Sequence, residues 1–333
     1  MIPPTRPAFC PARKFTAAAA LPFVALLAAS CGNSFNDTGD AETRAFTHSQ
    51  GVTEIPVEPQ RIVTTTDQNA LLPLLELGIT PVGSAGIELD GGQIRFRRTD
   101  GYDTTSVEPV GPYGAPNLEK IAALNPDVIV GYEYDSDMYD DLSAIAPTVL
   151  IQVFDRPLDD ALLDFADLAG ETDRAEEMQA DFRARVDDFL DKLGDRKDTL
   201  SISLISQYEP GQFNRVDIGQ ATGTVMQALD LLRPAPQQGP GDFEDYSIET
   251  LGQHDADVVL VFDYSDDEGQ RADNPLYNSP VFAELAATKA GQAYVIDGAT
   301  TVGAAWGKMI AFLDELERIL LAEDLRTDVV IEN

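Results

Sequence analysis

The chain has 333 residues and a formal net charge of −34, from 57 acidic and 23 basic side chains. A chain this negative repels nucleic acids and anionic lipid surfaces, so we expect no nucleic-acid partner. With this length and 44% hydrophobic residues, it can bury the cores of two domains.

The N-terminal segment is typical of a lipoprotein signal peptide. Arg6, Arg13 and Lys14 precede an apolar run that is shorter than the ~20 residues of a membrane-spanning helix. Small residues lead to Cys31, which can carry a lipid. We therefore predict a signal peptide over residues 1–30 and a lipid anchor at Cys31, on the outer (periplasmic or extracellular) face of the cytoplasmic membrane. An ordinary secretory signal or a short membrane span is the alternative.

The next part of the chain is predicted to be a tether followed by an α/β lobe. Residues 31–54 are polar and aperiodic, which indicates a flexible tether. Residues 55–156 alternate between strands and helices, which predicts a mostly parallel sheet covered by helices. In chain order we expect a strand over 61–66, a helix over 69–77, a strand over 79–86, a helix and strand over 117–131, and a further helix and strand over 142–153.

Residues 157–197 lack strand signals and are predicted to be an interlobe helical segment. One helix over 159–169 ends at Gly170, and Thr172 caps a second helix that reaches Leu193 with one apolar stripe. Residues 198–333 return to the alternating pattern and form a second α/β lobe. Its predicted elements are strands over 200–205, 258–262 and 293–296 and helices over 222–232 and 305–322.

An internal repeat with an offset of 130 residues supports two lobes of similar build. Residues 117–121 align with 247–251, and residues 127–130 align with 257–260. In both copies a capping residue is followed by a glutamate, Glu119 or Glu249, in the first turn of a helix. An acid there gains stability from the helix dipole alone, but two equivalent glutamates also suggest a paired docking device for basic residues of another protein.

The sequence offers little support for catalysis or direct metal binding. It contains no G-x-S-x-G, G-x-x-x-x-G-K-[ST] or H-E-x-x-H motif. Its histidines are His48, in the predicted tether, and His254, between a short helix and a strand. We therefore expect no catalytic residue and no protein site for a bare transition metal.

The predicted lipoprotein start, the RIVTTTDQNALLPLLELGITPVG and NLEKIAALNPDVIVGY segments and the long interlobe helix resemble the substrate-binding lipoproteins of iron-siderophore ABC importers, which are related to cobalamin and haem binders. The resemblance covers about residues 55–325. It implies that the protein captures a ferric siderophore and delivers it to an ABC permease, whose arginines pair with Glu119 and Glu249. The iron would be bound only within its chelate, with no other cofactor, and we expect a monomer.

The resemblance also implies a ligand cleft between the lobes, lined by the loops that follow the strands. Arg215 is the stronger candidate for an anionic ligand, whereas Arg95, Arg97 and Arg98 either bind the ligand or neutralise nearby acids. Trp306 is placed at the mouth of the cleft. The expected ligand residues are Thr66, Asp67, Gln68, Ser84, Ala85, Pro112, Tyr113, Tyr132 and Tyr134 in the first lobe, and Gln207, Tyr208, Phe213, Arg215, Phe243, Tyr264 and Trp306 in the second.

The acidity of the chain favours a neutral or cationic hydroxamate complex over a ferric catecholate. Two alternatives stay open at this point. The first is haem or a corrinoid, with a tyrosine or His254 as an axial ligand. The second is an enzyme or a docking subunit without a transported ligand.

Overall fold

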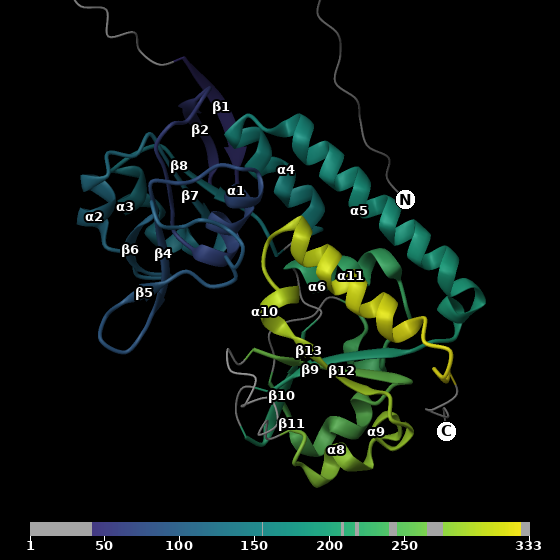
Figure 1. The fold of residues 1–333 in the computed structure, drawn as a ribbon. Coiled ribbons are helices and arrows are strands. Elements are labelled where there is room, and N and C mark those ends of the chain that lie inside the picture. Colours follow the sequence, from purple (N-terminus) through teal and green to yellow (C-terminus); the bar gives the residue numbers. More distant parts are fainter. Residues whose placement is uncertain are drawn as a thin grey trace, which may run out of the picture. The chain divides into compact units, whose positions relative to one another are not determined.

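The computed structural model describes residues 42–154, 156–207, 210–216, 220–239, 245–264 and 276–327. A two-stranded hairpin, two larger β-sheets and their helices make up this part of the chain (Figure 1). The predicted signal peptide, Cys31, Tyr208 and Phe243 lie outside the described residues. Within those residues, no helix is both long enough and apolar enough to cross a bilayer.

The first sheet is mostly parallel, as predicted. Its strands lie in the order β5–β4–β3–β7–β8, with β6 paired to β4, and β5 alone is antiparallel to its neighbour. Strands β3, β7 and β8 are almost wholly buried, as parallel strands with two covered faces should be. The elements are β3 (Ile62–Thr64), a π-helical turn (Asp67–Leu71), α1 (Leu72–Glu76), β4 (Gly83–Glu88), β5 (Ile94–Arg95), β6 (Glu108–Pro112), α2 (Leu118–Ala123), β7 (Val128–Tyr132), a 3-10 helix (Glu133–Met138), α3 (Tyr139–Ser143) and β8 (Thr148–Ile151).

A β-hairpin replaces the C-terminal part of the predicted tether. Strands β1 (Thr43–His48) and β2 (Gly51–Pro56) pair with each other, and Phe46 and Ile55 are buried in the main core. At the turn, Ser49 donates its backbone N–H (3.2 Å) and its Oγ (2.9 Å) to the carbonyl of Leu150 in β8. The tether prediction is therefore wrong for residues 43–54. Phe46 and Ile55 anchor the hairpin. Because only these two side chains are buried among polar neighbours, the sequence shows no strand periodicity there.

His48 belongs to a hydrogen-bond network that joins the hairpin to β8. Its Nδ1 accepts from the backbone N–H of Leu150 (3.2 Å), and its Nε2 lies 2.9 Å from Thr53 Oγ1. Because Nδ1 accepts, the ring proton lies on Nε2 and is donated to Thr53, whose hydroxyl donates to the carbonyl of Thr148 (3.2 Å). Burial lowers the pKa of His48. This network therefore requires the neutral imidazole.

Mild acid should loosen this hairpin. Since the pKa of His48 is lower in the folded than in the unfolded chain, its contribution to stability is full above the unfolded value of about 6.5 and is lost as pH falls below it. We expect the amide of Leu150 to exchange faster at pH 5 than at pH 7.5, after correction for intrinsic rates. Hydrogen exchange followed by mass spectrometry measures this. A His48→Gln variant that kept the same pH dependence would contradict the assignment.

Two helices connect the strands of the first sheet to those of the second. Helix α4 (Leu158–Ala169) ends at Gly170, whose φ of 74° favours glycine. Helix α5 (Thr172–Leu193) has 22 residues, and Figure 1 shows it beside the last helix, α11 (Trp306–Leu320). The predicted long helix is thus confirmed, although Glu171 and not Thr172 is its N-cap residue. Its buried apolar stripe consists of Ala175, Phe182, Val186, Phe189 and Leu193.

The second sheet combines a parallel core with an antiparallel side. Its strand order is β11–β10–β9–β12–β13, in which β9, β12 and β13 are parallel and β10 is antiparallel to both of its neighbours. The elements are a 3-10 helix (Gly194–Asp198), β9 (Ile202–Ser206), β10 (Gln212–Arg215), α6 (Gln220–Leu229), a 3-10 helix (Ala235–Gln237), β11 (Asp245–Ser247), the 3-10 helix η5 (Ile248–His254), β12 (Val258–Asp263), α8 (Pro280–Glu284), α9 (Ala286–Ala290), β13 (Ala293–Asp297), α10 (Gly298–Thr301) and α11.

The 130-residue repeat corresponds to one structural device that occurs in both sheets. Asp127, just before β7, accepts from the backbone N–H groups of Gln60 (2.6 Å) and Arg61 (3.0 Å), at the start of the adjacent β3. Asp257, just before β12, accepts from the N–H (2.9 Å) and Oγ (2.8 Å) of Ser201, at the start of the adjacent β9. Each aspartate therefore aligns two neighbouring parallel strands.

Candidate functional site

The predicted ligand residues of the first lobe gather at one edge of its sheet. Asp67 follows β3, Tyr113 follows β6, and Tyr132 and Tyr134 stand at the end of β7. These three strands belong to the parallel part of the sheet, so their carboxyl ends share one edge. Phe154 follows β8 and joins the same edge, although the sequence analysis missed it. The signal that identifies Tyr132, an aromatic residue after a buried strand, applies equally to Phe154.

Asp67 and Arg97 form a buried ion pair at this edge. The Asp67 side chain is fully buried, and its carboxylate accepts from Arg97 Nη2 (2.8 Å), Nε (3.0 Å) and backbone N–H (2.8 Å). The backbone N–H of Gln68 adds a fourth donor at 2.9 Å. Burial alone would lower the pKa of Arg97, but the hydrogen bonds and charge of Asp67 outweigh it and raise the pKa. The alternative in which Arg97 neutralises a nearby acid is therefore the one observed.

Two further groups surround the guanidinium of Arg97. The ring of Tyr113 lies 4.6 Å from Arg97 Cζ, within cation–π range, and 45% of Tyr113 is exposed. When the amide of Gln68 is oriented to satisfy its neighbours, its oxygen accepts from Arg97 at 2.9 to 3.1 Å. The guanidinium of Arg97, whose charge is balanced by Asp67, therefore lies beneath the exposed ring of Tyr113.

Three aromatic side chains form a cluster on the same edge, which we call the aromatic cluster: Tyr132, Tyr134 and Phe154. Their ring centroids are 5.2 to 6.3 Å apart, and Tyr134 stacks on Phe154 with 59% of its surface exposed. Glu133 fixes the cluster by accepting from the backbone N–H groups of Val153 and Phe154. Burial, followed by the charge of Asp135, raises the pKa of Tyr132 to about 12, so its phenol stays neutral at physiological pH.

Asp135 positions the end of β7 from below. It is 2% exposed, accepts from the hydroxyl of Thr65, and accepts from the backbone N–H of Tyr132 at 3.2 Å. A Cβ on Gly131 would lie 2.6 Å from this carboxylate and 2.7 Å from Thr65 Oγ1, so only glycine fits there. The sequence analysis did not single out Asp135, because its role depends on contacts between segments distant in the chain.

Some predicted ligand residues of the first lobe are part of the interior. Ser84 is fully buried, accepts from Thr64 Oγ1 (2.8 Å) and donates to the carbonyl of Ala85 (2.8 Å). Thr66 is 2% exposed and precedes the π-helical turn. Ser84 therefore joins β4 to β3, and neither residue is presented at the surface.

The second-lobe predictions need larger corrections. Arg215 is 6% exposed and donates to the backbone carbonyl of Gln237 (2.9 Å), so its guanidinium is directed into the lobe. Phe213 is 1% exposed and packs against Tyr246 and His254. Both side chains lie on β10, whose inner face belongs to the core. The ring of Tyr264 does lie near the first lobe, 5.9 Å from Arg98 Cζ.

Trp306 is a core residue and not a residue at a cleft mouth. It is 2% exposed and lies in the main hydrophobic cluster. Its backbone N–H donates to Glu76 Oε2 (2.8 Å), and the N–H of Gly307 donates to Glu76 Oε1 (2.6 Å). Glu76, at the end of α1, therefore caps the N-terminus of α11. Its proximity to a loop suggests exposure of the indole, but the side chain packs into the main core.

Further hydrogen bonds join the loops of the two sheets near Asp67. Gln220 Nε2 donates to Asn69 Oδ1 (2.8 Å), and the backbone N–H of Ala304 donates to the carbonyl of Gln68 (3.1 Å). The turn that carries Asp67 is therefore fixed both by its own sheet and by α6 and the start of α11. The sequence gives no sign of these pairs, whose members are over 150 residues apart.

His254 is not available as an axial ligand in this structure. Its side chain is 2% exposed, packs between Phe213 and Tyr246, and lies 3.2 Å from Gln237 Nε2 through Nδ1. Burial, followed by the charge of Arg215, lowers the pKa of His254 to about 4. Among the described residues, no group of three or more His, Cys, Asp or Glu side chains could hold a metal ion.

Glu119 and Glu249 occupy equivalent, exposed positions, as the repeat predicts. The Asn117 side chain accepts from the backbone N–H of Lys120 (2.9 Å), and the Ser247 side chain accepts from that of Glu249 (3.4 Å). Each glutamate is thus the second residue of a capped helix. Neither forms an ion pair with another described residue. The helix after Ser247 is a 3-10 helix, but this leaves the first turn in place.

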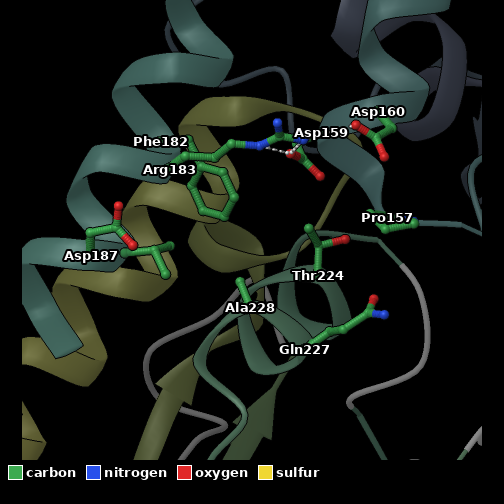
Figure 2. A pocket seen from close by; sticks show the side chains of 10 residues that line it. Pro157, Asp159, Asp160, Phe182, Arg183, Asp187, Thr224, Gln227 and Ala228 are labelled. Atoms are coloured by element: carbon green, nitrogen blue, oxygen red, sulfur yellow. Dashed lines mark hydrogen bonds and ion pairs between the residues drawn. The ribbon is translucent and has the colours of Figure 1, made fainter.

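A surface pocket of about 370 Å³ lies apart from these residues, between α4, α5 and α6. Phe182, Val186 and Ala228 give it an apolar floor. Figure 2 shows Arg183 reaching from α5 towards Asp159 and Asp160, with hydrogen bonds of 3.0 and 2.9 Å. No predicted ligand residue lines it.

Comparison with known proteins places the chain in a family. Residues 85–300 match the family described as periplasmic binding protein. The probable siderophore-binding lipoprotein YfiY of Bacillus subtilis is 30% identical over 302 residues, which cover 87% of this chain and 91% of YfiY. The predicted resemblance is therefore confirmed.

Solved structures agree with this assignment. Staphylococcus aureus SirA, complexed with staphyloferrin B, has a TM-score of 0.71 at 25% identity, covering 85% of this chain and all of SirA. The triscatecholate siderophore-binding protein FeuA of Bacillus subtilis, complexed with ferri-bacillibactin, has the same fold, with a TM-score of 0.69 at 22% identity over 83% of this chain and 98% of FeuA. The names of YfiY and FeuA describe binding proteins. The chain belongs to the periplasmic binding protein family.

Proposed function

We propose that this protein captures a ferric siderophore outside the cytoplasmic membrane and delivers it to an ABC permease. The names of its relatives support the ligand class, since YfiY is named as a siderophore-binding lipoprotein and SirA was solved with staphyloferrin B. In this proposal Cys31 carries the lipid anchor, and Glu119 and Glu249 contact the permease. The protein makes and breaks no bond, and the siderophore supplies all ligands of the iron.

The aromatic cluster, next to the charge-balanced Arg97, is the observation that carries the proposal. Exposed rings at the carboxyl ends of parallel strands provide flat, apolar contacts for a bulky chelate. Within the described part of this edge, the neutral phenol of Tyr132 and the Asp67–Arg97 pair add hydrogen-bonding groups without a net charge. We therefore favour a neutral chelate of the hydroxamate type, even though FeuA, of similar fold, is a triscatecholate binder.

A titration series tests this function. Isothermal titration calorimetry should detect binding of a ferric tris-hydroxamate with a dissociation constant in the micromolar range or below. This corresponds to a binding free energy of about −8 kcal/mol or more favourable. The iron-free hydroxamate should bind at least roughly tenfold more weakly, because it lacks the compact shape of the complex. Ferric catecholate, ferric citrate and haemin complete the series. Absence of binding by every ferric chelate would refute the proposal.

Two variants locate the ligand. Tyr134→Ala removes an exposed stacking ring and should weaken ferric chelate binding roughly 3- to 10-fold, the range expected for one aromatic contact. Tyr294→Ala removes a tyrosine from β13 of the second sheet and serves as the matched control. Equal effects of the two variants would exclude the aromatic cluster as the binding surface.

Haem or a corrinoid is the second candidate, favoured by the relationship within the family and by the abundance of tyrosine near the edge. The burial of His254 and the raised pKa of Tyr132 count against both as axial ligands. A Soret band that sharpens on titration with haemin, together with no response to ferric hydroxamate, would decide for haem.

A further inference from the structure

We propose that Asp67 sets the charge selectivity of the receptor by cancelling the positive charge of Arg97. This inference rests on the proposed function, because it concerns which class of ferric chelate the same site accepts. A ferric tris-hydroxamate is neutral, since three monoanionic groups balance Fe³⁺, whereas a ferric tris-catecholate carries three negative charges. A receptor that discriminates between them needs control over the charges at its ligand surface.

Asp67 is not itself placed to touch the ligand. It is fully buried, and its two carboxylate oxygens face four donors: Arg97 Nη2, Arg97 Nε and the backbone N–H groups of Arg97 and Gln68. Any effect of Asp67 on binding therefore passes through the residue that it pairs with. Asp67 is a positioning residue in this sense, and it supplies charge as well as geometry.

Arg97 is the link between Asp67 and the surface. Its side chain is 19% exposed, and its guanidinium lies 4.6 Å from the ring of Tyr113, which is 45% exposed. Without Asp67, the guanidinium of Arg97 would attract an anionic chelate, and the attraction would be only partly screened because the side chain is partly buried. With Asp67 in contact, the pair has no net charge, and an anion gains little from approaching it.

The pairing also fits the rest of the chain. The Asp67 carboxylate binds the guanidinium through both oxygens and also accepts from the backbone N–H of Arg97, so the two charges are held in contact. In addition, the formal charge of the chain is −34, so the surrounding field already disfavours anions. Both the local pair and the global charge therefore act in the same direction, towards neutral ligands.

A charge series on the pair tests the proposal. Asp67→Asn leaves the arginine uncompensated, Arg97→Gln leaves the aspartate uncompensated, and the double variant restores a neutral pair with similar side-chain volumes. Asp181→Asn, at an exposed position of α5, controls for the change in net charge. Arg95 and Arg98, the other arginines of this segment, are unchanged in every variant, so differences between variants report on the pair.

The measured quantity is the ratio of affinities for a ferric tris-catecholate and a ferric tris-hydroxamate, at low and at high salt. We expect Asp67→Asn to raise this ratio roughly tenfold or more, Arg97→Gln to lower it, and the double variant to return it to within about threefold of the starting value. The increase in Asp67→Asn should shrink at high salt. Asp181→Asn should leave the ratio unchanged.

A purely structural role for Asp67 makes a different prediction. If Asp67 had only such a role, Asp67→Asn would weaken the binding of both chelates equally and leave the affinity ratio and its salt dependence unchanged. That result would overturn the proposal. If Asp67→Asn fails to fold, Arg97→Gln decides the matter, because an unaltered ratio in that variant has the same meaning. If the unaltered protein binds no ferric chelate, the proposed function fails, and that result is distinct from a failure of the selectivity series.

Discussion

We expect the double variant Glu119→Lys/Glu249→Lys to lose ferric chelate uptake while binding the chelate as the unaltered protein does. Both glutamates are exposed, and each sits in the first turn of a capped helix at the equivalent point of the repeat. Their caps fix the backbone of each first turn, and the glutamates project from it at exposed positions. Charge reversal turns each attraction into a like-charge contact, which costs several kcal/mol.

Single variants and a matched control sharpen this experiment. Each single reversal should reduce uptake by roughly tenfold or more, since about 1.4 kcal/mol corresponds to a factor of ten. The control pair Glu58→Lys/Glu177→Lys changes the net charge equally at other exposed positions. Uptake of radiolabelled iron in cells that depend on this receptor, beside calorimetry on the purified variants, provides the two readouts. Normal uptake by the double variant would rule out the docking assignment.

The substitution Glu76→Ala should lower the free energy of unfolding by about 2–4 kcal/mol. Its carboxylate accepts from the first two backbone N–H groups of α11 at 2.8 and 2.6 Å, and 93% of the residue is buried. Alanine leaves both N–H groups without these acceptors, that of Trp306 in the buried core, and removes a negative charge from the helix N-terminus. Because Glu76 lies in α1, the substitution also removes one contact between the first lobe and α11.

Urea denaturation of three variants measures this contribution. Glu76→Gln keeps one acceptor oxygen and should fall between the unaltered protein and Glu76→Ala. Glu177→Ala, at an exposed position of α5, should change stability by less than about 0.5 kcal/mol. A similarly small change for Glu76→Ala would mean that water replaces the carboxylate at the helix end.

The parts of this molecule that follow local rules could be predicted from the sequence. The stripe of α5, the stop at Gly170 and the caps at Asn117 and Ser247 depend only on neighbouring residues. The repeat correctly paired Asp127 with Asp257, because each acts on the strand beside its own. These features need no knowledge of how distant segments meet.

The candidate site was harder to predict because its residues meet only in three dimensions. Asp67 and Arg97 are 30 positions apart, and their pairing depends on the path of the loop after β5. Phe213, Arg215 and Trp306 were placed in a cleft because they follow or precede regular elements, yet their side chains face the core. Sequence position identifies the edge of a sheet but not the direction in which a side chain points.

The β1–β2 hairpin has a consequence for how far the protein can move from the membrane. Because residues 43–56 are part of the folded body, only the segment from Cys31 to Glu42 separates it from the proposed lipid. Even fully extended, that segment spans at most about 40 Å, roughly half the length of the predicted tether, which extends to Glu54. If Cys31 carries the proposed lipid, the folded body stays within about one bilayer thickness of its anchor.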